Sequence, residues 1–192
     1  MKKFLLLLQI LVVSALCMIS CGKGNVVSPT CSMTVKSTYN DFSCYLQLPA
    51  GEIIDTLSFN DGVAFLERSD TLNMPYVAYL YFVNRQDSLD TMNMPVVVEK
   101  GQVSVSVSEY ISTAGTPLNA RLQSFLNDLQ MVSEGIREKG IKSIDEINSA
   151  YSSYYKMQIM QNKDNVVGKY IYEYYGIHLN DADRKSLEAV MN

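Results

Sequence analysis

The sequence predicts an α+β fold, in which an N-terminal antiparallel β-sandwich of about seven meandering strands precedes a C-terminal bundle of about four helices. In the first part, short runs rich in β-branched and aromatic residues recur, and turn residues separate them. In the second part, apolar residues recur at helical spacing. We therefore divide the chain into a signal peptide (1–20), a tether (21–30), a β-sandwich domain (31–116) and a helical region (117–192).

The first twenty residues have the pattern of a lipoprotein signal peptide. Lys2 and Lys3 precede an apolar run over residues 4–16, which is shorter than the roughly 20 residues of a membrane-spanning helix. The run ends in CMISCGKG, where Ser20 directly before Cys21 resembles a bacterial lipobox. We expect cleavage before Cys21 and lipidation of that residue, which would anchor the protein in the cell envelope, in the outer membrane and facing the periplasm. Ordinary secretion and an uncleaved anchor remain alternatives.

Composition and net charge disfavour some classes of binding partner. The chain is 47% hydrophobic and 19% charged, which is typical of a globular protein. Loss of Lys2 and Lys3 with the signal would change the formal charge from −4 to −6. An acidic body disfavours binding to nucleic acid or to an anionic lipid surface, so membrane contact is expected through the lipid alone. Residues 22–30, GKGNVVSPT, are interpreted as a flexible tether.

The β region contains one duplicated stretch. DTLNMPYV at residues 70–77 returns as DTMNMPVV at residues 90–97. Each copy follows a turn and leads into an apolar strand, and a proline is tolerated at the start of a strand or on a sheet edge. Two copies do not make a repeat array. We interpret both as strand entries rather than as a functional cassette. The clearest strand is VSVSVS at 103–108, whose valines should face one side and whose serines should face the other.

Local capping signals set the boundaries of the helices. Thr116 is expected to be the N-cap of the first helix, with Pro117 at its first position, and Gly140 should end it. The later signals are, in order, a capping box of Ser143 and Glu146, a helix over 165–175 closed by Gly176, and a short helix capped by Asn180.

Cys31 and Cys44 are the mature cysteines besides the anchor. In an oxidising envelope they are candidates for a disulfide, which would contribute about 3 kcal/mol. Free buried thiols and a redox-active pair remain open. A redox role has less support, because reactive pairs are usually Cys-x-x-Cys at the start of a helix.

No pattern typical of an enzyme is present. The sequence lacks a Gly-rich phosphate loop, a Gly-x-Ser-x-Gly elbow and a His-Glu-x-x-His motif. Its only histidine, His178, cannot by itself supply a zinc site, and a Ser-His-Asp triad would need it to be placed by chance. We therefore predict a non-enzymatic protein without metal or cofactor.

Tyrosines are concentrated near the C-terminus. Seven of the thirteen lie between residues 151 and 175, and Tyr170, Tyr172, Tyr174 and Tyr175 lie on more than one face of the third predicted helix. Packing within the bundle, a surface for a partner or a second copy, and a platform for sugars all remain open.

MPVVVEKGQVSVSV followed by STAGTPLN resembles the end of an uncharacterised β-sandwich domain found in lipoproteins of Bacteroidota. Glu99, Gly101, Gly115, Thr116 and Asn119 carry this resemblance, and IIDTLSFNDGVAFL and KDNVVGKYIYEYY extend it. In many relatives these parts precede a thioredoxin-like domain with a Cys-x-x-Cys motif, which is absent here. The resemblance implies a fold, an envelope location and a partner-binding or substrate-presenting role.

The leading functional hypothesis is therefore a lipid-anchored, non-catalytic binding or adaptor module. An accessory of periplasmic thiol-disulfide chemistry, with a thioredoxin-like protein as partner, is the first alternative. A glycan-binding lipoprotein is the second.

Overall fold

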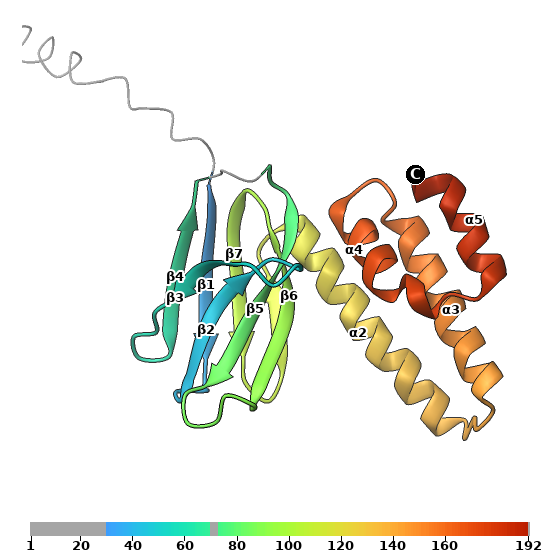
Figure 1. Cartoon of the computed structure of the whole chain (residues 1–192), viewed down its shortest axis with the longest axis horizontal. Helices are drawn as coiled ribbons and strands as arrows, with labels where there is room; N and C mark the ends of the chain where they lie inside the picture. Colours follow the sequence, from blue (N-terminus) through green and yellow to red (C-terminus); the bar gives the residue numbers. More distant parts are fainter. Residues whose placement is uncertain (1–29, 70–72, 192) are drawn as a thin grey trace, which may run out of the picture.

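The computed structural model describes residues 30–69 and 73–191 and has an α+β fold, with eight strands followed by four α-helices (Figure 1). The strands are β1 (Cys31–Ser37), β2 (Phe42–Gln47), β3 (Ile53–Leu57), β4 (Val63–Arg68), β5 (Tyr76–Asn84), β6 (Thr91–Val98), β7 (Gly101–Val107) and β8 (Ile111–Ala114). The helices are α2 (Pro117–Glu138), α3 (Ile144–Gln161), α4 (Val166–Tyr175) and α5 (Asp181–Met191), with a 3₁₀ turn, η1 (Gly176–His178), before α5. The signal peptide, Cys21 and tether residues 21–29 lie outside the described residues.

The strands form two four-stranded sheets, with the orders β4-β1-β7-β8 and β3-β2-β5-β6. Most neighbours are antiparallel, but β1 and β7 run parallel, with Cys31 opposite Gly101 and Ser37 opposite Val107. The predicted all-antiparallel meander is therefore wrong. The chain changes sheets after β1 and later returns to place β7 beside it. An alternating pattern identifies the buried face of a strand but does not identify its neighbour.

One hydrophobic core lies between the two sheets. On β7 the valines are buried while Ser104 and Ser106 are exposed, which confirms the predicted alternation. Strands of both sheets contribute to this core, including Met33, Val35, Leu46, Leu80, Phe82, Val103 and Val105. The two sheets are therefore held together by their inner faces.

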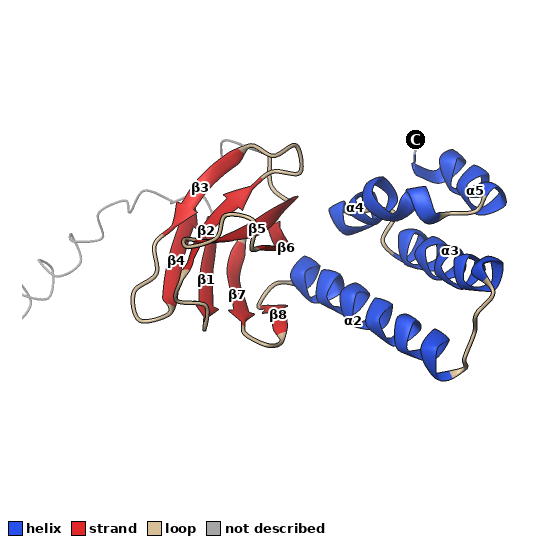
Figure 2. Ribbon diagram, turned by 60° about the horizontal axis from the view of Figure 1, so that its bottom comes forward, coloured by secondary structure: helices blue, strands red, loops and turns tan. Residues whose placement is uncertain are grey.

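A second core lies between the β3-β2-β5-β6 sheet and the helices. Val77 of β5 and Val97 of β6 belong to this core, whereas Val96 and Val98 of β6 belong to the first. Figure 2 shows the helices on one side of the sheets, with α2 starting beside β6 and β8. Because β5 and β6 are covered on both faces, three consecutive valines of β6 are buried.

The prediction that both octets are strand entries holds only for the described part of the first, because β6 already begins at Thr91 and contains almost all of the second octet. Pro75 lies directly before β5, and Pro95 lies within β6, which is an edge strand of its sheet. A proline on an edge leaves no unpaired partner inside the sheet, because the missing N–H would have pointed outwards. Residues 70–72 of the first octet lie outside the described part of the chain.

The predicted helix boundaries are confirmed. Gly140 follows α2 with a positive φ of 63°, as a glycine just beyond a helix commonly has. The Ser143 hydroxyl accepts a hydrogen bond from the Glu146 N–H. The side-chain oxygens of Asn165 and Asn180 cap α4 and α5 in the same way. At the start of α2, however, Thr116 makes no capping bond of its own.

Candidate functional site

The residues that carry the family resemblance lie together where the sheets meet α2. The side-chain oxygen of Asn119 accepts a hydrogen bond from the Val97 N–H at 2.9 Å, and its NH₂ group donates to the Val97 carbonyl at 2.8 Å. The same NH₂ group donates to the Thr116 hydroxyl at 2.8 Å. Glu99 accepts from the N–H groups of Leu118 and Asn119 at 2.9 and 3.1 Å. A carboxylate from the sheet therefore caps the positive end of α2.

Two glycines make this junction possible. Gly115 has a φ of 105°, and a Cβ at this position would overlap the carbonyl oxygen of Gln102. Gly101 has a φ of 122°, and a Cβ there would lie 3.2 Å from the Thr116 methyl group. The backbone of the β8–α2 connection therefore lies directly against β7, closer than any side chain allows. These motif residues build the joint between sheets and helices, and they carry no reactive group into a cavity.

The predicted partner surface of Tyr170, Tyr172, Tyr174 and Tyr175 is largely internal. Tyr170 is buried, Tyr172 and Tyr175 are half-buried against the second core, and only Tyr174 is exposed, at 38%. The four tyrosines therefore do not form one exposed surface, and packing within the fold, which the sequence left open as one interpretation, accounts for Tyr170, Tyr172 and Tyr175. The cause is the packing of α4 on the sheet, which helical periodicity alone does not reveal.

Tyr79 on β5 is the sheet residue against which these rings pack. Its ring centroid lies 6.3 Å from that of Tyr170 and 5.8 Å from that of Tyr174, both in edge-to-face geometry. Burial raises the pKa of Tyr79 to about 12, and burial also raises the pKa of Tyr170. Both phenols therefore stay protonated at neutral pH. They form a rigid aromatic wall between α4 and the sheet.

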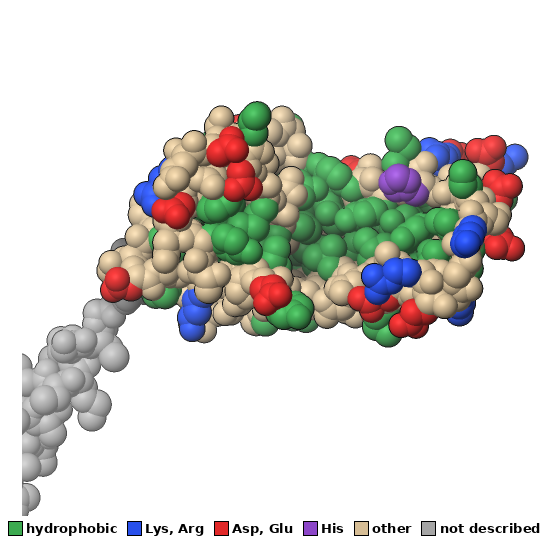
Figure 3. Space-filling view, turned by 90° about the horizontal axis from the view of Figure 1, so that it is seen from below, with side chains coloured by type: hydrophobic (Ala, Val, Ile, Leu, Met, Phe, Trp, Pro, Cys, Tyr) green, Lys and Arg blue, Asp and Glu red, His purple; other side chains and the backbone are tan. Residues whose placement is uncertain are grey.

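A groove of about 1130 Å³ opens beside this wall. It lies between the edges of the two sheets and helices α2 and α4, and a hollowed band rich in hydrophobic side chains joins the two parts of the molecule in Figure 3. Tyr110 and Ile111, from the β7–β8 hairpin, line the groove with exposures of 79% and 38%. Tyr174 lines it from α4 and also lines an adjoining hollow of about 500 Å³.

Polar residues of the groove come mainly from α2. Gln123, Asn127 and Gln130 line it and repeat at i, i+4 and i+7, so they form one stripe along the helix. Sequence reasoning missed this stripe and also missed Tyr79 and Tyr110. The amide spacing was a readable signal, whereas nothing in the sequence places β7–β8 opposite α4.

Cys31 and Cys44 do not form the predicted disulfide. Both are free and both are buried. Cys31 begins β1 of one sheet, whereas Cys44 lies in β2 of the other sheet. Burial raises the pKa of Cys44 to about 12 and also raises the pKa of Cys31, so both remain protonated thiols.

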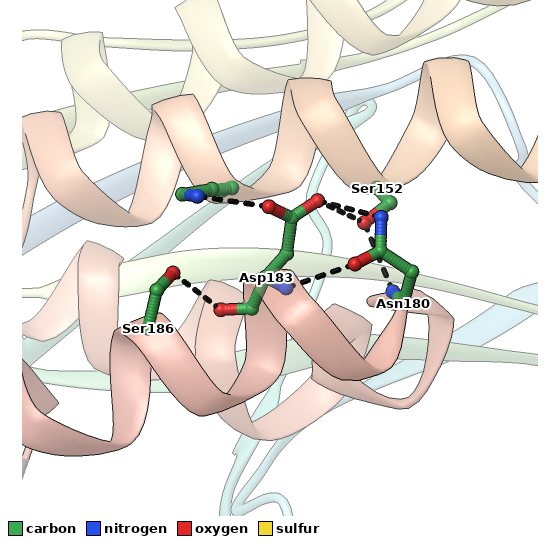
Figure 4. Close-up of polar contacts among 5 residues, drawn as sticks. Ser152, Asn180, Asp183 and Ser186 are labelled. Carbon is green, nitrogen blue, oxygen red and sulfur yellow. Dashed lines mark hydrogen bonds and ion pairs between the residues drawn. The ribbon is translucent and has the colours of Figure 1, made fainter.

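A polar cluster joins α3 to α5 (Figure 4). The Ser152 hydroxyl donates to Asp183 at 2.7 Å and accepts from the Asn180 N–H at 2.9 Å. Lys156 forms an ion pair with the other Asp183 oxygen at 2.8 Å. The pKa of Asp183 is lowered most by the hydrogen bond from Lys156 and next by the hydrogen bond from Ser152. Ser152 is fully buried and both of its hydrogen-bonding roles are used, so the cluster fastens two helices and presents no nucleophile.

His178 lies in η1, between α4 and α5, and its ring centroid is 6.0 Å from that of Tyr155. Within residues 30–69 and 73–191, no group of three or more His, Cys, Asp or Glu side chains is placed to hold a metal ion. None of the helices in this described part is long and apolar enough to cross a bilayer.

No protein-family model matches the chain, and a search of curated proteins finds no match.

Proposed function

We propose that this protein is a lipid-anchored, non-catalytic binding or adaptor module of the cell envelope, in which a β-sandwich and a helical region together form the binding site. The tyrosine-lined groove between them is the observation that carries the proposal. Ligand sites are commonly concave, mostly apolar surfaces with a few placed polar groups, and they often lie between parts of a fold.

The groove has the features expected of a preformed site. The Asn119 bonds and the Glu99 cap fix α2 to the sheet, and the Tyr79 contacts fix α4. Its two most exposed aromatic rings, those of Tyr110 and Tyr174, come from the β7–β8 hairpin and from helix α4. Such a rigid aromatic surface loses little conformational entropy when it binds a ligand.

The lipid anchor is proposed from the sequence around Cys21. Attachment there would leave residues 22–30 as a short tether between the lipid and β1. The alternative role in thiol-disulfide chemistry would depend on docking a thioredoxin-like partner, because Cys31 and Cys44 are buried and protonated.

A photo-crosslinking experiment tests the binding role. Benzoylphenylalanine replaces Tyr110 in the groove or, as the matched control, Phe65, which is 75% exposed on the edge strand β4 and does not line the groove. Irradiation of intact cells should give a discrete adduct from position 110 and not from position 65. Benzophenone inserts into C–H bonds of proteins and sugars alike, so either kind of ligand is captured. Equal or absent adducts at both positions would contradict the proposal.

A further inference from the structure

We propose that the groove binds an uncharged glycan. This inference rests on the proposed binding function and adds the chemical class of the ligand. Its basis is the chemistry of the groove lining: five tyrosines, five side-chain amides and a single charged residue, Glu109. No lysine or arginine lines the groove, so it offers no counter-charge to an anionic ligand.

Tyrosine rings and amides together match a polyhydroxylated chain. A sugar ring has an apolar face of C–H groups, which carry partial positive charge and pack on the negative face of an aromatic ring. Its hydroxyls both donate and accept hydrogen bonds, and an amide side chain offers one acceptor and two donor hydrogens in one plane. Tyr110 and Tyr174 supply exposed rings on different elements that border the same space.

The amides of α2 are held in place before any ligand arrives. Gln123 accepts a hydrogen bond from the Thr113 N–H at 2.7 Å and donates to the Asn127 side-chain oxygen at 2.8 Å. The Gln130 amide donates to Glu134 at 2.9 Å. Within the described residues, the Asn127 NH₂ group and the Gln130 carbonyl oxygen then remain for a ligand. Exposed Asn93, on β6 across the groove, adds a further amide.

An extended peptide is less suited to this groove, because several of the backbone groups along the two sheet edges are already paired or missing. On the edge of β6, the Asn119 amide takes both backbone groups of Val97, and Pro95 has no N–H. On the edge of β8, Gln123 takes the N–H of Thr113. Strand addition needs a continuous row of free backbone donors and acceptors. The groove therefore favours a ligand recognised by side chains.

Calorimetry with the full chain, purified in a zwitterionic detergent without a sugar headgroup, tests the inference. The probes are the hexasaccharides of β-1,4-glucose, α-1,4-glucose, β-1,4-xylose and β-1,4-N-acetylglucosamine, with hexagalacturonate as the anionic comparison. At least one neutral hexasaccharide should bind. Tyr110→Ser and Asn93→Ala should each weaken that binding about tenfold. Both side chains are exposed, so neither change should unfold the protein.

Phe65→Ser is the matched control, because it removes an equally exposed aromatic ring outside the groove, and it should bind as the unaltered chain does. The inference is wrong if no neutral probe binds, if only hexagalacturonate binds, or if Tyr110→Ser and Asn93→Ala leave binding unchanged. A protein adduct from position 110 combined with no glycan binding would preserve the binding function and reject the glycan. If photo-crosslinking gives no specific adduct and calorimetry shows no glycan binding, both the binding function and the glycan inference are rejected.

Discussion

The side-chain amide of Asn119 pairs with the backbone of Val97 as a neighbouring strand would, accepting from its N–H at 2.9 Å and donating to its carbonyl at 2.8 Å. Both residues are fully buried. The edge of β6 is thus completed by a residue from the first turn of α2, and the orientation of the helix is fixed by the sheet.

Replacement of Asn119 by alanine should destabilise the protein by about 2–4 kcal/mol, because the N–H and the carbonyl of buried Val97 both lose their partner. Urea unfolding measures the loss. Asn127→Ala, an exposed change on the same helix, should cost less than about 0.5 kcal/mol. Similar costs for the two variants would show that the Asn119–Val97 pairing contributes little.

Gly115→Ala should be far more damaging than Gly140→Ala. Both glycines have a positive φ, which costs an alanine about 1–2 kcal/mol. At Gly140 no atom lies within 4 Å of an added Cβ, whereas at Gly115 the Cβ would overlap the Gln102 carbonyl oxygen. Gly115→Ala must therefore also move the β8–α2 connection away from β7. Thermal unfolding compares the two variants, and an equal loss of stability would contradict the close backbone approach.

Cys31 and Cys44 should resist alkylation in the native protein. The thiolate is the reactive form, and a pKa of about 12 leaves Cys44 about one ten-thousandth ionised at pH 8. Iodoacetamide labelling followed by peptide mass spectrometry should modify both residues only after unfolding in urea. Rapid labelling of the native chain, or recovery of a Cys31–Cys44 disulfide, would restore the thiol-chemistry alternative.

Asp183→Asn should weaken the docking of α5 in a pH-dependent way. The pKa of Asp183 is lowered in the folded protein, chiefly by the hydrogen bond from Lys156, so its stabilising effect is present above the ordinary carboxyl pKa of about 3.9. It is lost as the pH falls through the lower folded pKa. The stability difference between the unaltered chain and Asp183→Asn should therefore be full at pH 7 and shrink below about pH 4. Asp181→Asn, on the same turn, serves as the control, and a difference that persists undiminished at pH 3 would argue against the charged contact.

Cys21→Ser should move the protein from the membrane fraction to the soluble fraction of cells, because it removes the proposed site of lipidation. Cys17→Ser should leave the distribution unchanged, since bulky Leu16 precedes that cysteine and fits the cleavage pattern poorly. Mass spectrometry of the N-terminal peptide identifies the acyl chains directly. Membrane retention of Cys21→Ser would show that another segment holds the protein there.

Local features of this fold could be predicted from the sequence, and long-range ones could not. Gly140, Ser143, Asn165 and Asn180 act on backbone groups within a few residues of themselves, so their motifs suffice. The parallel pairing of β1 with β7 joins segments about seventy residues apart in the chain, and both segments would show the same alternation with any neighbour.

In the candidate site, too, local features could be predicted from the sequence and long-range contacts could not. Periodicity placed the four tyrosines on several faces of α4 but did not show that Tyr79 of β5 covers two of them. The motif residues Glu99 and Asn119 were identified, yet their bonds across the sheet–helix boundary could not be read from spacing. The groove consists of side chains from six separate segments, so only the assembled fold shows it.

The carboxylate of Glu99 links the folding of the sheet region to the folding of the helical region. Glu99 lies in the turn between β6 and β7, yet its carboxylate caps the first N–H groups of a helix that begins eighteen residues later, at Pro117. A chain cut after residue 116 would leave the start of α2 without this cap in one piece and the Glu99 carboxylate without its hydrogen-bond donors in the other. We expect the halves to unfold in a single cooperative step and to resist separate expression, so that the chain behaves as one indivisible unit of folding.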